Sequence, residues 1–396
     1  MTTDHTQMPS GTFFMQAQEQ VVFGRPAEQA VMEQVERMGA RRVFLTSGRT
    51  LGQLDDGPLQ RIRRALGDRH CGTWSRIRAH SPREDVIDGA LAAREAGADL
   101  LVAVGGGSVI DATKAMLMAI WMGLDTPEQM APFRNNQPPG EARPVEAPIG
   151  AIRMLAVSTT LSASEFTPNA GVTESQTHTK QSYSHRLMVP VTAILDPQAT
   201  LDTPLDLLFN TAIRAVDHAV ESFCSPKANP ATEPLSLQGW RLLAGSLPVI
   251  QADPTDLDAR LQAQFGMWQA IAGSVAGART GASHGIGYAL GATFNIAHGH
   301  TSCVMLPAVL RWNAAVNADR QRLLSEAVGQ PDVPAADLVA ALVARLGLPG
   351  SLRDVGVGRE HFADIAKRAL VYVNLRDNPR PITGIEEVTA ILELAA

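Results

Sequence analysis

The stretch Leu100-Leu101-Val102-Ala103-Val104-Gly105-Gly106-Gly107-Ser108 joins an apolar run to a glycine-rich turn. The apolar run predicts a buried parallel strand, and residues 109–118 after the turn predict a helix. Three glycines at this junction leave backbone N–H groups bare at the positive end of a helix, with no Cβ in the way. We interpret the turn as a phosphate site, although glycine clusters also form plain tight turns. Its spacing matches neither G-x-G-x-x-G nor a P-loop, so neither of those folds follows.

Composition excludes several classes of partner. The chain has 396 residues, enough for about two domains, and 45% of them are hydrophobic. A net charge of −6 and only 5% aromatic residues give no support for nucleic-acid binding. The longest apolar stretch, residues 115–124, is too short to span a bilayer.

The cysteines and the N-terminal residues indicate in which cellular compartment the protein is expected. Cys71, Cys224 and Cys303 are far apart and odd in number, which favours a reducing compartment without a disulfide framework. Residues 1–10 are polar and lack the apolar segment of a signal peptide. We therefore expect a soluble cytoplasmic protein with no membrane or nucleic-acid partner.

Strand and helix patterns alternate in the first half of the chain. We expect strands at residues 21–24, 42–46, 100–104 and 152–157, and helices at residues 27–38, 59–66, 84–96 and 109–118; residues 194–197 close the region. This rhythm predicts a parallel sheet with helices on both faces. Residues 135–148, rich in Pro, Gly, Asn and charge, read as a surface loop.

Long helical patterns fill the second half of the chain, from residue 205 to about residue 392. The fold class is therefore α/β plus all-α. We predict an α/β dinucleotide-binding domain over residues 1–197 and an α-helical domain over residues 198–396, with the functional site in the cleft between them.

Histidines in the second half are candidate metal ligands. His218 lies in a predicted helix, His284 in a glycine-rich segment, and His298 and His300 flank a glycine. A lone histidine is usually structural or solvated, but neutral imidazole suits Zn or Fe, and small neighbours let a ligand approach. Their spacing alone does not show that they converge.

Four motifs together carry a family resemblance. They are Gly105-Gly106-Gly107-Ser108-x-x-Asp111-x-x-Lys114, the segment Ser158-Thr159-Thr160-Leu161-Ser162-Ala163-Ser164-Glu165-Phe166-Thr167, Ile194-Leu195-Asp196-Pro197, and His284 followed by His298-Gly299. In this order the chain resembles the iron-containing (group III) alcohol dehydrogenases, most closely their maleylacetate-reductase-like branch, over about residues 20–390. The resemblance implies an α/β dinucleotide-binding domain followed by a helical domain. It also implies hydride transfer between NAD(P)H and a carbonyl, and a homodimer.

The cofactor residues follow from the same resemblance. The pyrophosphate loop corresponds to Gly105, Gly106, Gly107 and Ser108, with Asp111 behind it. A second loop bordering the phosphates and nicotinamide corresponds to Thr159, Thr160 and Ser162, and Lys180 falls where a lysine near the ribose is common. After the second strand no acid is available for the ribose 2′-OH, while Arg49 and Thr50 could accept a 2′-phosphate. NADPH and NADH both stay open.

The family's metal site is only partly matched. His218, His284 and His298 occupy three of its ligand positions. The first position, an acid in most members and Asn in some reductases, is Arg214, and the histidine usually found four residues after the third ligand is Tyr288. Arginine is always charged and cannot ligate a cation, and it would repel one at close range.

Two mechanisms remain open at this stage. In one, His218, His284 and His298 hold Fe or Zn as a three-histidine site. In the other, which we favour, no metal binds and Arg214 supplies the positive charge that polarises the substrate oxygen. Tyr288 and His284 are then further candidates for catalysis. Asp217, adjacent to His218, is expected to be a poor substitute ligand, because one residue turns a helix face by about 100°.

The substrate is expected to be a small carbonyl compound, an aldehyde or a maleylacetate-like oxo acid. A guanidinium suits an anionic group, since its planar fork matches a carboxylate. Two other functions are weighed against this one. A metal-dependent lyase of the dehydroquinate-synthase type shares the glycine turn, but residues 158–167 match the dehydrogenases. A catalytically lapsed nucleotide-binding protein would also explain Arg214 and Tyr288.

Overall fold

A computed structural model describes residues 12–135, 137, 141, 143–177 and 179–396. The chain forms two compact units, each described here by itself. The sheet unit comprises Gln16–Leu208 and Val249–Gln264, and the helical unit comprises residues 12–15 with Phe209–Pro248 and Phe265–Ala396.

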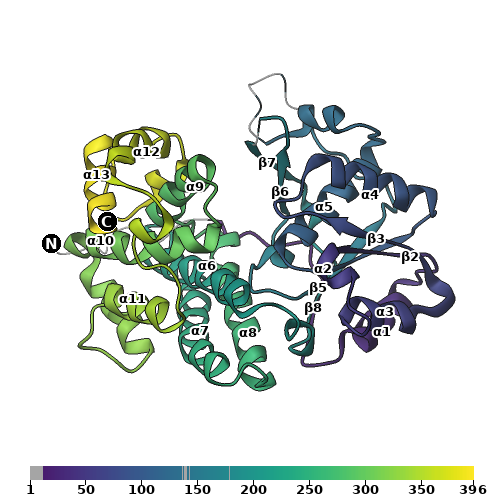
Figure 1. The fold of residues 1–396 in the computed structure, drawn as a ribbon, viewed down its shortest axis with the longest axis horizontal. Helices are drawn as coiled ribbons and strands as arrows, with labels where there is room; N and C mark the ends of the chain where they lie inside the picture. The colour runs from purple at the N-terminus through teal and green to yellow at the C-terminus, as the bar shows by residue number, and fades with distance from the viewer. Residues whose placement is uncertain (1–11, 136, 138–140, 142, 178) are drawn as a thin grey trace. The chain divides into compact units, whose positions relative to one another are not determined.

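The sheet unit is built on a six-stranded parallel sheet in the order β1-β8-β5-β4-β2-β3 (Figure 1). Its strands are β1 (Gln20–Phe23), β2 (Val43–Gly48), β3 (His70–Ile77), β4 (Leu100–Gly105), β5 (Arg153–Ser158) and β8 (Thr192–Leu195). The central strand β4 is buried along its whole length, as its unbroken apolar run predicts.

Helices cover both faces of this sheet. On one face lie α1 (Ala27–Met38) and α3 (Pro58–Leu66), and on the other lie α4 (Arg83–Glu95) and α5 (Gly107–Met122). Strand β2 shows how the sequence sorts side chains between the two faces: Leu45 packs with α1 and α3, whereas its neighbour Phe44 packs with α4 and α5. This is the two-residue period of a strand buried on both sides. The prediction of a parallel α/β sheet is confirmed.

Some elements escaped the sequence analysis. Strand β3 at the sheet edge is only partly buried, and it has no apolar run that could mark it. A separate antiparallel hairpin, β6 (Asn169–Glu174) with β7 (Thr179–Ser184), is largely polar, so it also lacks an apolar run that could mark its strands. Within the expected loop at 135–148, residues 136, 138–140 and 142 lie outside the described residues, and the rest carry no helix or strand. Residues 1–10, which the sequence analysis interpreted as lacking a signal peptide, also lie outside the described residues.

The helical unit confirms the helical reading of the second half. Its helices, some of which begin or end in the sheet unit's residues, are α6 (Leu205–Cys224), α7 (Glu233–Ala252), α8 (Leu257–Val275), α9 (Ala282–Phe294), α10 (His298–Ala327), α11 (Ala335–Arg345), α12 (Phe362–Ala369) and α13 (Ile385–Leu394). One apolar cluster joins α9, α10, α12 and α13. The domain boundary between residues 197 and 198 stays a prediction. Among the described residues, none of the helices combines the length and apolar character that crossing a membrane requires.

Candidate functional site

The glycine turn stands where the sequence places it. Strand β4 ends at Gly105, Gly106 caps α5, and the helix begins at Gly107. A Cβ on Gly106 would lie 2.8 Å from Thr160 Cγ2, and a Cβ on Gly107 would lie 2.9 Å from Ser162 Oγ. Only glycine therefore lets the second predicted loop pack this closely against the turn. The two loops that the resemblance assigns to the cofactor are brought together in the sheet unit.

Hydrogen bonds join the two loops to each other and to the segment after β3. The amide of Thr159 donates to the Gly105 carbonyl at 3.1 Å. The Ser108 hydroxyl accepts from the amide of His80 at 3.1 Å, and the Ser81 hydroxyl donates to the Ser108 carbonyl at 2.7 Å. Ser108 is thus tied to the loop after β3, and its role toward a cofactor stays a prediction.

Asp111, four residues after Gly107, forms hydrogen bonds with residues of three neighbouring segments. Its carboxylate accepts from Lys114 Nζ at 3.0 Å, from the amide of Gly171 at 2.9 Å, and from the Ser164 hydroxyl. The buried Lys114 also donates to the Asn169 carbonyl at 2.6 Å, so the pair links α5 to β6. These contacts are structural, and the cofactor role predicted for Asp111 has no further support from them.

The two other cofactor candidates lie at different places in the sheet unit. Arg49 begins the short helix α2 (Arg49–Gly52) directly after β2 and is exposed there. Lys180 lies on β7, where its side chain passes over Gly171 on the paired strand β6. Both assignments stay predictions.

Three helices of the helical unit carry the other candidate residues. Arg214, His218 and their neighbours lie on α6, His284 and Tyr288 on α9, and His298 at the start of α10. The start of α10 approaches α6 so closely that a Cβ on Gly299 would clash with the backbone of Asn210. The His298-Gly299 motif therefore has a packing reason, since it lets α10 begin against α6.

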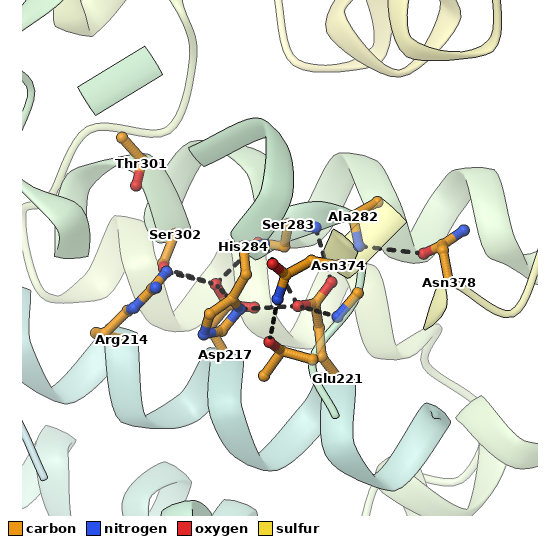
Figure 2. Close-up of polar contacts among 12 residues, drawn as sticks. Arg214, Asp217, Glu221, Ala282, Ser283, His284, Thr301, Ser302, Asn374 and Asn378 are labelled. Carbon is orange, nitrogen blue, oxygen red and sulfur yellow. Dashed lines mark hydrogen bonds and ion pairs between the residues drawn. The ribbon is translucent and has the colours of Figure 1, made fainter. Parts of the chain in front are cut away.

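Arg214 is held by two neighbours. Its Nη1 donates to Ser302 Oγ at 3.0 Å and lies 3.6 Å from Asp217 Oδ2 (Figure 2). Asp217 is fully buried, and the same Oδ2 accepts from the Ser302 hydroxyl at 2.6 Å and from the Ser283 hydroxyl at 2.9 Å. One carboxylate oxygen thus organises side chains from α6, α9 and α10.

His284 is held by a second carboxylate. Its Nδ1 lies 2.8 Å from Glu221 Oε2 and 3.4 Å from Asp217 Oδ2. Glu221 also accepts from the backbone amides of Gly281 at 2.8 Å and Ser283 at 2.7 Å, at the start of α9. With Glu221 as the acceptor, the Nδ1 of His284 carries a proton, and Nε2 is left for another partner.

Burial and charge shift the titration of this cluster. Burial lowers the pKa of His218 well below its ordinary value, and the nearby His284 and Arg214 act in the same direction. Burial and Arg214 also oppose a charged His284, but Asp217 and Glu221 outweigh them and raise its pKa. Burial alone would raise the pKa of Asp217, yet His284 and Arg214 hold it below its ordinary value.

The cluster does not fit a divalent metal as it stands. Asp217, Glu221 and His284 form the one set of candidate ligands in the described chain whose atoms lie within 4.8 Å of one another. Nδ1 of His284 donates to Glu221, and Asp217 Oδ2 accepts two hydroxyls beside the Arg214 cation. Three other atoms of the cluster, Asp217 Oδ1, His218 Nδ1 and His284 Nε2, are buried without a hydrogen-bond partner among the described residues. The obstacle to a metal is charge, because a cation bound by Asp217 would lie close to the Arg214 guanidinium, which repels it and cannot act as a ligand.

The predicted three-histidine set is only partly assembled. The rings of His218 and His284 lie 4.5 Å apart, centroid to centroid. Tyr288 makes edge contacts with His284 at 6.2 Å and His298 at 5.9 Å, also between centroids. The structure therefore places Tyr288 among the candidate residues, together with the ring of Tyr372 at 5.4 Å.

Sequence reasoning missed Glu221 and undervalued Asp217. A usable signal was present, because Asp217 and Glu221 are four residues apart on α6 and therefore share a face, and Arg214 is three residues before Asp217. The two serines give no such signal, since hydroxyls are common on helices and only tertiary contacts reveal their partners.

Comparison with known proteins decides the family. Residues 18–197 match the model of the iron-containing alcohol dehydrogenases, and residues 208–396 match the C-terminal model of the same family. The chain belongs to the iron-containing alcohol dehydrogenase family. It lies in the maleylacetate-reductase-like branch and is an NAD(P)-dependent oxidoreductase.

Curated relatives and solved structures agree with this placement. The chain is 32% identical to a maleylacetate reductase of Sphingobium indicum, over 92% of this chain and 91% of the relative. It is 30% identical to the dehydrogenase FUM7 of Gibberella moniliformis, over the full length of both. The maleylacetate reductase structure from Agrobacterium tumefaciens superposes with a TM-score of 0.80 at 26% identity, covering 98% of each chain. An iron-containing alcohol dehydrogenase from Corynebacterium glutamicum reaches 0.81 at 26% identity, over 98% of this chain and 97% of that one.

Proposed function

We propose that this oxidoreductase reduces the carbonyl of a small anionic aldehyde or oxo acid to an alcohol without a metal. The observation that carries the proposal is the guanidinium of Arg214, which is anchored by Ser302 and Asp217. The family resemblance assigns this residue to the position of an acidic metal ligand. A maleylacetate-like oxo acid is the substrate class that the relatives named maleylacetate reductase suggest.

In the proposed reaction, a bound NAD(P)H would supply a hydride to the carbonyl carbon, and the carbonyl π electrons would pass to the oxygen. Arg214 stabilises the alkoxide that forms, as a fixed positive charge in a site of low dielectric. A proton from Tyr288 or His284 then completes the alcohol. We propose that the glycine turn of the sheet unit binds the cofactor that would supply this hydride.

Metal chemistry is not part of the proposed steps. A bound Fe or Zn would act as a Lewis acid on the carbonyl oxygen. In this chain Arg214 would supply that charge, because its guanidinium already lies beside the Asp217 carboxylate and would repel a metal cation there. His218 and His298 would then pack beside the site rather than bind metal.

The test is an NAD(P)H oxidation assay against a panel of aldehydes and oxo acids that includes maleylacetate, with wild-type protein and Arg214→Ala. We expect wild type to reduce an oxo acid, and Arg214→Ala to lose roughly 10²-fold or more in kcat, the scale of losing one electrostatic stabiliser. Cofactor affinity should be unchanged in the variant. A wild-type protein that binds NAD(P)H but reduces no member of the panel would instead favour a lapsed nucleotide-binding homologue.

A further inference from the structure

Asp217 and Ser302 form a buried support beneath the Arg214 guanidinium. Ser302 Oγ accepts from Arg214 Nη1 at 3.0 Å and donates to Asp217 Oδ2 at 2.6 Å, while Nη1 itself lies 3.6 Å from Oδ2 (Figure 2). The three side chains therefore close a small ring of polar contacts. Asp217 and Ser302 have no exposed surface, and the Arg214 side chain is 12% exposed.

The polar contacts of Arg214 come from two different helices, so they restrict the orientation of its guanidinium. Arg214 and Asp217 are one turn apart on α6, whereas Ser302 comes from the second turn of α10. An arginine side chain has several rotatable bonds, and holding it in one geometry costs conformational entropy. Two acceptors on different elements remove that freedom before a substrate binds, which is how a charge is preorganised for catalysis.

Ser283 offers a comparison with Ser302, because in the described part of the chain it is hydrogen-bonded to Asp217 but not to Arg214. Its hydroxyl donates to the same Asp217 oxygen at 2.9 Å, whereas the polar contacts of Arg214 in the described residues are with Ser302 and Asp217. Ser302 and Ser283 are both fully buried serines that share one acceptor, and they differ in their contact with the guanidinium. The chain thus contains its own matched control.

We propose that Asp217 and Ser302 are positioning residues that hold Arg214 in the geometry for stabilising the substrate oxyanion. This inference rests on the proposed function of Arg214. It adds that the Asp217 carboxylate and the Ser302 hydroxyl orient the Arg214 guanidinium, which takes the place of the metal in the proposed reaction. Neither residue touches the substrate in this account.

The experiment is a double-mutant cycle on the full-length enzyme. The variants are Ser302→Ala, Ser283→Ala, Asp217→Asn and Arg214→Ala, with each serine change also made in the Arg214→Ala background. The readouts are kcat and KM for reduction of maleylacetate, the Kd for NADPH, and the free energy of unfolding in urea. Asp206→Asn, an exposed acid on the same helix, controls for a change of charge on α6.

We expect Ser302→Ala to lower kcat about tenfold, as for loss of a hydrogen bond to a charged group, without changing the Kd for NADPH. In the Arg214→Ala background the same change should alter kcat by less than about twofold, because a positioning residue has nothing left to position. Ser283→Ala should have the same proportional effect in both backgrounds. Asp217→Asn, which keeps the shape and loses the charge, should lower kcat as Ser302→Ala does, and Asp206→Asn should leave it unchanged.

The outcomes separate this inference from the proposed function. If Arg214→Ala retains wild-type kcat, the proposed role of Arg214 is wrong. If Arg214→Ala loses activity but Ser302→Ala lowers kcat by the same factor in both backgrounds, only the positioning role is overturned. If no compound is reduced, additive effects of Arg214→Ala and Ser302→Ala on the free energy of unfolding would still overturn the coupling between them.

Discussion

The guanidinium carbon of Arg214 lies 5.4 Å from the centre of the Tyr288 ring. The family resemblance predicts that these two residues stand where other members carry metal ligands, and the structure brings them together from α6 and α9. A cation over an aromatic face is attracted by the ring, and the contact is stronger where water is excluded. The two departures therefore form one interacting pair, as expected if a single change of mechanism accounts for both.

Removing the Tyr288 hydroxyl should separate the two contributions of this ring. Tyr288→Phe keeps the aromatic face under Arg214 and loses only the hydroxyl, so we expect a folded protein with a lower kcat. Tyr288→Leu should lose both the hydroxyl and the cation–π contact, with a further fall in kcat. The measurement is steady-state kinetics with unchanged unfolding curves as the control. Full activity of Tyr288→Phe would remove Tyr288 from the list of proton donors.

A Cβ at Gly106 should weaken cofactor binding indirectly. Because that Cβ would lie 2.8 Å from Thr160 Cγ2, even Gly106→Ala must push Thr160 away. We expect the Kd for NAD(P)H to rise at least tenfold, about 1.4 kcal/mol. Adding Thr160→Ser removes the colliding methyl group and should recover part of the affinity. Equal cofactor affinity in wild type and folded Gly106→Ala would show that this turn does not bind the cofactor.

Cofactor preference is expected to depend on Arg49. The residue is exposed directly after β2, at the carboxyl end of a parallel strand, where α/β sheets bind nucleotides. Arg49→Asp should lower kcat/KM for NADPH more than for NADH, because a carboxylate repels a 2′-phosphate and can accept from a 2′-OH. The neutral variant Arg49→Gln should shift the ratio in the same direction but less. An unchanged ratio in both variants would mean that another residue reads the ribose.

Glu165 should make stability depend on pH. Burial raises its pKa from 4.5 to about 7, and the nearby Lys114 opposes this only in part. The folded state then holds a proton that the unfolded state has released, so stability should fall as pH rises from about 4.5 to about 7 and then level off. The full loss would be about 3 kcal/mol at 1.36 kcal/mol per pH unit.

Urea unfolding at several pH values measures this effect. Glu165→Gln removes the titrating group and should flatten the curve between pH 4.5 and 7, whereas the exposed control Glu146→Gln should keep the wild-type slope. If wild type and Glu165→Gln show the same slope in this window, Glu165 is not the group responsible.

The sheet and the glycine turn could be predicted because local sequence determines them. An apolar run such as residues 100–104 has one stable environment, and three glycines after it allow one kind of turn. The edge strand β3 and the β6–β7 hairpin lack that signal, since half-exposed strands need few apolar residues. The candidate site was harder to predict because it depends on tertiary pairing. The family resemblance pointed to Arg214 as a candidate, but Ser302 is 88 residues away in the chain, and no sequence rule pairs them.

Metal content of the active enzyme tests the central claim most directly. The measurement is elemental analysis of purified wild type for Fe and Zn, with NAD(P)H-dependent reduction assayed before and after treatment with a chelator. The account predicts far less than one metal ion per chain and no loss of activity on chelation. Arg214→Asp, which replaces the cation by the acid usual in the family, should bind Zn more tightly than wild type. A stoichiometric Fe or Zn in wild type, removed together with activity by the chelator, would contradict the account and make His218, His284 and His298 metal ligands.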